Sequence, residues 1–243
     1  MSRIFATEED GELSRRAGSG QIRARTLYKP RALIQARAVD DAIDALFKHA
    51  DFIRIGVMGS AALVYEDKIA QKCRALGRAI AQNSFAILTG ACPGLPHETV
   101  LGAKELGGHS IGISPARNLE EHQTVFESPY HEYDVMIYTG LGLMGRELVN
   151  IRTSDIIIIV GGRSGTLGEF AIAYEEGKVI GVLKGTGGVA DSLAEFESIL
   201  AKGTGAIVIH EEDPAELVKR VVEAYRSRTG MECPSPKAKI EPG

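Results

Sequence analysis

The sequence lacks the patterns that mark several large protein classes. No run approaches the ~18 consecutive apolar residues that a helix needs to cross a bilayer, so no membrane partner is expected. The 6 histidines show no HExxH or comparable spacing, so no metal site is expected. The GxxxxGKS/T motif of a P-loop is also missing.

Cysteine is scarce, and the chain has no excess of positive charge. The chain has 3 cysteines, Cys73, Cys92 and Cys233, and none has CxxC spacing, which disfavours a disulfide framework and favours a reducing cytoplasm. The first twenty residues are charged and contain no apolar segment of the kind found in secretory signals. The formal net charge is −4, so no basic surface is expected to hold nucleic acid.

The chain divides into three parts by composition. Residues 1–27 are rich in Arg, Glu, Gly and Ser, which predicts a flexible N-terminal arm or an oligomer contact. Residues 28–228 are predicted to form one domain, and residues 229–243 a tail. Within the domain, residues 39–49 have helical apolar spacing.

Short apolar runs alternate with helical patterns along the rest of the domain, which predicts an α/β fold with a doubly wound, mostly parallel sheet of about seven strands. The predicted strands are residues 53–58, 84–88, 110–113, 135–138, 156–160, 179–183 and 206–209. The predicted helices are residues 66–82, 96–106, 141–153, 166–176, 189–202 and 214–227. Asp213 is the predicted N-cap of the last helix, with Pro214 at its first position. Residues 118–134 are polar and aromatic and predict a long loop.

Three glycine-rich turns follow predicted strands, at residues 56–61, 89–94 and 161–166. In an open α/β sheet such turns share the edge at which ligands bind, and glycine lets a ligand approach the backbone. We therefore predict that they bind a phosphate-bearing ligand. The predicted binding residues are Gly59, Ser60, Gly90, Gly94, Gly161, Gly162, Ser164, Gly165 and Thr166.

The third turn carries the strongest signal. Gly165 and Thr166 are predicted to open a helix, whose free amide groups and dipole favour an anion. Glu169 lies three residues after Thr166, so a capping box is an equally good interpretation of this spacing.

Arg146 is a second candidate, on the helix predicted at 141–153. At i, i+4 and i+7 it shares a face with Asn150 and Thr153. An arginine there could bind a phosphate or carboxylate through two hydrogen bonds, although most arginines lie on the surface. The predicted apolar stripe of this helix is Leu141, Met144, Leu148 and Ile151.

Three further signals have simpler explanations. Residues 140–145 fit GxGxxG, but the next strand ends in Val160 and Gly161 rather than in an acidic residue, which disfavours a dinucleotide site. Cys92 and His97 could form a nucleophilic pair, but a packed thiol and a surface histidine are more common. Lys184 could contact an anion, but most lysines are simply solvated.

The segment from Gly161 to Glu169 resembles the PGGxGTxxE motif of the LOG family, phosphoribohydrolases within the SLOG group of Rossmann-like nucleotide-binding proteins. The resemblance runs roughly from Arg54 to Arg226. It implies that Arg146, nine residues before Asp155, and Glu169 are catalytic. The chain departs from the motif at Val160, which replaces its proline, and by one extra residue in the turn. The second turn also lacks the family's Gly-Leu-Met-Gly.

The resemblance implies hydrolysis of the N-glycosidic bond of a nucleoside 5′-monophosphate, with no cofactor, by a homodimer or higher homo-oligomer. The related molybdenum-cofactor carriers share the scaffold, so a carrier or sensor of a nucleotide-like ligand is the alternative. A cysteine enzyme that uses Cys92 is a third.

Overall fold

The computed structural model describes residues 53–62, 64–200 and 202–231. The predicted N-terminal arm and the helix at 39–49 lie outside these ranges, as does the tail from residue 232. Within the described residues, no helix combines the length and apolar character needed to cross a bilayer.

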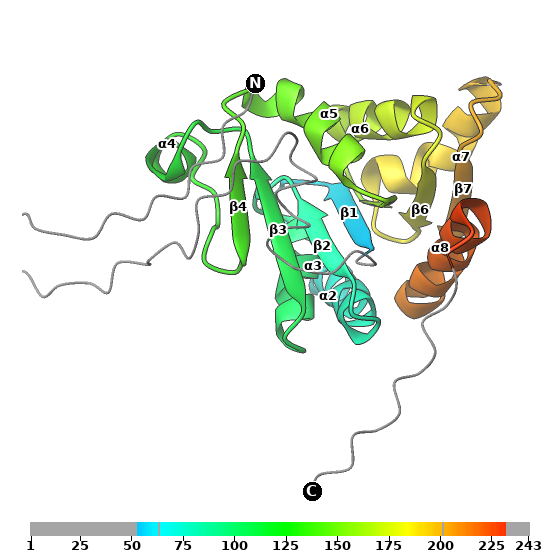
Figure 1. Ribbon diagram of the computed structural model, residues 1–243, viewed down its shortest axis with the longest axis horizontal. Coiled ribbons are helices and arrows are strands. Elements are labelled where there is room, and N and C mark those ends of the chain that lie inside the picture. Colours follow the sequence, from blue (N-terminus) through cyan, green and yellow to red (C-terminus); the bar gives the residue numbers. More distant parts are fainter. Residues whose placement is uncertain (1–52, 63, 201, 232–243) are drawn as a thin grey trace, which may run out of the picture. The chain divides into compact units, whose positions relative to one another are not determined.

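Seven parallel strands form one sheet, as the alternating pattern predicts (Figure 1). The strands are β1 (Arg54–Gly59), β2 (Ala86–Thr89), β3 (His109–Ser114), β4 (Val135–Tyr138), β5 (Ile156–Val160), β6 (Val179–Leu183) and β7 (Ile207–Glu211). The order across the sheet is β4-β3-β2-β1-β5-β6-β7. The chain winds outward from β1 to β4 and then returns to place β5 beside β1. This reversal is the topological switch point of a doubly wound fold.

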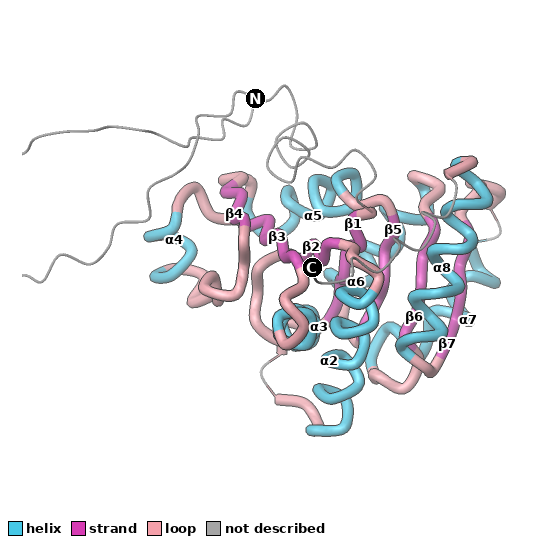
Figure 2. Tube along the Cα trace, turned by 60° about the horizontal axis from the view of Figure 1, so that its bottom comes forward, coloured by secondary structure: helices cyan, strands magenta, loops and turns pink. Residues whose placement is uncertain are grey.

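Helices cover both faces of the sheet. They are α2 (Asp67–Gln82), α3 (Leu95–Lys104), α4 (Leu119–Thr124), α5 (Gly142–Thr153), α6 (Ser164–Glu175), α7 (Gly188–Leu200) and α8 (Pro214–Thr229). α2 packs against α3 and α8, and α6 packs against α5 and α7. Figure 2 shows α5 on one side of the strands and α2 and α3 on the other.

The core lies between these layers. All five residues of β5 are buried, as expected for a central strand covered on both faces. Asp155, just before β5, accepts hydrogen bonds from the backbone N–H of Arg54 at 2.8 Å and from its guanidinium at 3.1 Å. These bonds tie together the beginnings of the two strands at the switch point.

The segment predicted as a loop at 118–134 contains the short helix α4, so that prediction was wrong over six residues. The Asn118 side chain caps the helix by accepting from the backbone N–H of Glu121 at 2.9 Å. The capping residue was available in the sequence, but the helix is too short to show apolar periodicity.

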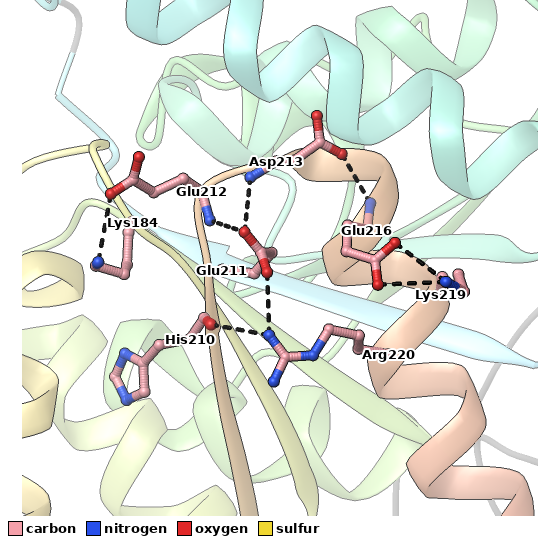
Figure 3. Close-up of polar contacts among 8 residues, drawn as sticks. All are labelled: Lys184, His210, Glu211, Glu212, Asp213, Glu216, Lys219 and Arg220. Carbon is pink, nitrogen blue, oxygen red and sulfur yellow. Dashed lines mark hydrogen bonds and ion pairs between the residues drawn. The ribbon is translucent and has the colours of Figure 1, made fainter.

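The start of α8 confirms the predicted cap. Asp213 Oδ1 accepts from the backbone N–H of Glu216 at 2.8 Å, and Pro214 occupies the first turn (Figure 3). The neighbouring Glu211 carboxylate accepts from two backbone N–H groups and from Arg220, which lowers its pKa. Lys184 pairs with Glu212 at 3.3 Å, so this lysine is engaged at the β7–α8 junction.

Candidate functional site

A cavity of about 310 Å³ opens at the carboxyl ends of β1 and β5, beside the topological switch point. This is the position where open α/β sheets bind ligands, and the volume is at the small end of the range for small-molecule sites. The lining residues come from the ends of β1 and β2, from α5 and from the start of α6. They are Val57, Met58, Gly59, Ser60, Ala61, Gly90, Cys92, Pro93, Pro96, Leu143, Met144, Arg146, Glu147, Arg163, Ser164, Gly165, Thr166 and Glu169.

The start of α6 lies at the cavity wall and differs from the predicted capping box. The helix begins at Ser164, with Arg163 as its N-cap, so Thr166 is already inside the first turn. The N-cap residue accepts no hydrogen bond through its side chain, and Glu169 makes no hydrogen bond back to the backbone at the start of the helix. The first amide groups of a helix have no acceptor within the helix, and the first three residues of α6, Ser164, Gly165 and Thr166, line the cavity. An anion placed there is also favoured by the helix dipole.

Gly90 provides the space for the Arg146 side chain. A methyl group on Gly90 would lie 1.2 Å from Arg146 Nη1, so only glycine admits the guanidinium at this position. Arg146 as a residue is 9% exposed, and its guanidinium makes long contacts of 3.4 Å to the carbonyl oxygen of Ile113 and 3.5 Å to Cys92 Sγ. Its Nε is buried without a hydrogen-bond partner among the described residues. Arg146 therefore enters the cavity with donor capacity left for a ligand.

The inward face of α5 is the polar one, which reverses the predicted orientation of its apolar stripe. Arg146, Asn150 and Thr153 are all buried, whereas Leu141 is 53% exposed and Met144 73%. Leu148 is also exposed, and Ile151 alone of the predicted stripe is buried. The prediction failed because it placed apolar residues in the core by default, while this helix buries polar residues, of which Arg146 lines the cavity.

Glu169 is buried on α6 and lines the cavity. No described residue donates a hydrogen bond to its carboxylate, and Arg146 lies beyond ion-pair distance. Burial raises the pKa of Glu169 to about 7, against the opposing effect of the Arg146 charge and with a smaller contribution from Glu147. A carboxyl group that changes ionisation near neutral pH suits acid–base chemistry.

Glu147 is a site residue that the sequence analysis missed. It is 7% exposed, lines the cavity, and receives no hydrogen bond within the described part of the chain. Its carboxylate oxygens lie against α6, 3.5 Å from where a methyl group on Gly165 would be and 3.3 Å from one on Gly168. Burial raises its pKa, with Arg146 opposing. Its place next to Arg146 in the sequence was a usable signal. It was overlooked because the apolar stripe of this helix was predicted to face the core.

The predicted binding residues fall into two groups. Gly59, Ser60, Gly90, Ser164, Gly165 and Thr166 line the cavity together with Arg146 and Glu169. Gly94, Gly161 and Gly162 do not. Gly161 and Gly162 instead line a second, more open cavity of about 300 Å³, which shares Ser60 and Arg163 with the first. Gly94 lets the second turn approach the first, because a methyl group there would lie 2.2 Å from the carbonyl oxygen of Ser60.

The Cys92–His97 pair does not form. Cys92 Sγ contacts the carbonyl oxygen of Gly90 and Arg146 Nη2, both at 3.5 Å. His97 is mostly buried rather than on the surface, with Nε2 3.9 Å from a Glu132 carboxylate oxygen, and burial lowers its pKa. No histidine among the described residues is therefore paired with Cys92 to activate it.

The fold defines a Rossmann-like α/β protein with a cavity at its topological switch point. The chain belongs to the SLOG cluster4 family, whose model matches residues 52–218. This places it in the SLOG group, as the glycine motif suggested; the matched family is cluster4 rather than LOG.

Relatives and solved structures agree with this assignment. An uncharacterised protein of Archaeoglobus fulgidus is 31% identical over 134 residues, which cover 54% of this chain and 80% of that protein. The structure of TM1055 has a TM-score of 0.62 at 24% identity, covering 71% of this chain and 99% of the other, and supports the fold. The molybdenum cofactor carrier protein of Chlamydomonas reinhardtii is 31% identical, with a TM-score of 0.57 and coverage of 71% and 99%.

Proposed function

We propose that this protein binds a nucleoside 5′-monophosphate in the cavity and hydrolyses its N-glycosidic bond to a free base and ribose 5-phosphate. The observation that supports it best is the buried Glu169 carboxylate, which has no partner among the described residues and shares a cavity with Arg146 and the start of α6. Burying a carboxylate without a partner is costly, so a functional role for it is favoured.

Each part of the site has a role in this reaction. The 5′-phosphate sits on the amide groups at the start of α6, and Arg146 adds a charge-assisted contact to the ligand. The oxygen of a water molecule attacks C1′ of the sugar as the C–N bond breaks, and the base leaves with the bonding electron pair and takes up a proton. Glu169 accepts the proton of the water and stabilises the positive charge that develops on the sugar.

The test uses purified protein and a panel of nucleoside 5′-monophosphates, with free base and ribose 5-phosphate measured separately. Glu169→Gln is compared with Glu223→Gln, a control on the exposed surface of α8. We expect turnover by the parent and the control, and a loss of at least about a hundredfold in Glu169→Gln, as is typical of a general base. Turnover that survives in Glu169→Gln would refute this assignment.

The second candidate is a carrier or sensor that binds a nucleotide-like cofactor without chemistry. It is favoured by the 31% identity to the Chlamydomonas reinhardtii molybdenum cofactor carrier protein, 99% of which is covered. Tight binding of a nucleotide or a pterin-type ligand with no product at any pH would favour the carrier over the hydrolase.

The proposed assembly is a homodimer or higher homo-oligomer. Sedimentation of the full chain at micromolar concentration checks it, and a single monomeric species would refute it.

A further inference from the structure

Two carboxylates, rather than one, face the ligand cavity from neighbouring helices. Glu147 on α5 and Glu169 on α6 are each 7% exposed and line the same cavity. Neither accepts a hydrogen bond from any described residue. Their mutual repulsion and their burial both oppose ionisation, and Arg146 is the cavity's buried cation that offsets them. Ionising the two carboxylates is therefore disfavoured in the empty protein, and a ligand that donates hydrogen bonds to them would offset this cost.

The position of Glu147 identifies which part of a ligand it meets. Its two oxygens lie along the first turn of α6, beside Gly165 and Gly168. The proposed phosphate position is the start of that same turn. In a nucleoside 5′-monophosphate a single methylene joins the phosphate to the sugar, so the sugar is the group held next to the first turn.

The chemistry of the pair narrows the ligand further. A carboxylate only accepts hydrogen bonds once it is ionised, as Glu169 is above about pH 7, so at that pH its partner must be a donor. An ionised phosphate offers none, whereas a ribose offers adjacent 2′- and 3′-hydroxyl groups. A 2′-deoxyribose offers only one of these two donors and would leave a buried acceptor unpaired.

We propose that Glu147 is a specificity-determining residue which, together with Glu169, accepts hydrogen bonds from the vicinal hydroxyl groups of a ribose 5-phosphate unit. The site thereby selects ribonucleotides over 2′-deoxyribonucleotides. This inference rests on the proposed function for the placement of the phosphate, but it concerns binding and does not require turnover.

The test is calorimetric titration of the full chain with ribose 5-phosphate and with 2-deoxyribose 5-phosphate, in the presence of EDTA to exclude metal bridging. Neither compound has a glycosidic base, so hydrolysis cannot contribute. The variants are Glu147→Gln, which keeps the shape of the side chain, and Glu147→Leu, which removes the acceptor. Glu223→Gln is the matched control.

We expect the parent and the control to bind ribose 5-phosphate at least about tenfold more tightly than the deoxy compound, as for a lost hydrogen bond to a charged group. This ratio should fall to about threefold or less in Glu147→Leu and to an intermediate value in Glu147→Gln, because only one hydroxyl then has a charged acceptor. A purely structural role for Glu147 would weaken both ligands equally and leave the ratio unchanged.

Three outcomes overturn the proposal: equal affinities in the parent, a ratio that survives in both Glu147 variants, or no binding of either sugar phosphate. Failure of the hydrolase assignment is distinguishable from these three outcomes. If the protein prefers ribose 5-phosphate but turns over no nucleotide, hydrolysis is refuted and the selection of ribose over 2-deoxyribose by Glu147 stands.

Discussion

Replacing Glu169 by glutamine should stabilise the empty protein in a pH-dependent way. The pKa of Glu169 is raised from its ordinary value of 4.5 to about 7, chiefly because the group is buried. Between these two values the folded protein retains a proton that the unfolded chain releases. Stability from this group is therefore present below pH 4.5 and is lost as the pH rises through about 7.

The magnitude follows from the two pKa values. Each pKa unit corresponds to about 1.4 kcal/mol, so the ionised carboxylate costs the folded state about 3 kcal/mol once the pH is above 7. Glutamine does not ionise and escapes this cost. We expect the free energy of unfolding of Glu169→Gln, relative to the parent, to rise by about 3 kcal/mol between about pH 4.5 and pH 8.

Urea unfolding of both proteins across this pH range measures the difference between their free energies of unfolding. The contributions of the other titrating groups largely cancel in this difference. Glu223→Gln, at an exposed position on α8, is the matched control for the substitution itself. A Glu169→Gln variant whose stability tracks the parent at every pH would show that the carboxylate is not held unpaired, and the reasoning about the site would fail with it.

Three further predictions concern the same cavity. Gly90→Ala should displace the Arg146 guanidinium and reduce ligand affinity at least about tenfold while the fold survives, since the clash is with the end of a flexible side chain; Gly203→Ala, with no close neighbour, should not. Arg146→Met should raise the pKa of Glu169 above about 7, because the positive charge that favours its ionised form is lost. Nucleotide turnover should then rise at higher pH than in the parent, and an unchanged pH profile would contradict the electrostatic role of Arg146. Alkylation of Cys92 should block binding by filling the cavity, whereas Cys92→Ala should keep turnover; loss of turnover in that variant would support a cysteine nucleophile instead.

The fold could be predicted from the sequence because its elements alternate cleanly. Five consecutive apolar residues at 156–160 marked the central strand, and Asp213 with Pro214 marked the start of the last helix. Strand order could not be predicted from these runs, since it depends on which strand pairs with β1 after the reversal. The short helix α4 was missed because six residues are too few to show a period.

The site could be predicted only in part. Glu169 was found through the glycine motif and Arg146 through its place on the preceding helix, and both line the cavity. Glu147 was missed because burial of an unpaired carboxylate contradicts the rule by which apolar faces are assigned to the core. Gly90 lines the cavity and has a second role that could not be predicted, because in the structure it makes room for the Arg146 side chain.

The pairing of β1 with β5 has a consequence for how the protein folds. These neighbouring strands are about a hundred residues apart in the chain, with Ile55 beside Ile156. Their pairing therefore brings together two segments separated by a long stretch of chain. Contacts of such large separation form slowly, because the entropy of the intervening chain must be lost before they bring any gain. The cavity lies across this seam, with Ser60 on one side and Glu169 on the other. A chain in which only β1 to β4 have assembled therefore has no binding site, and ligand capture reports on the completion of folding.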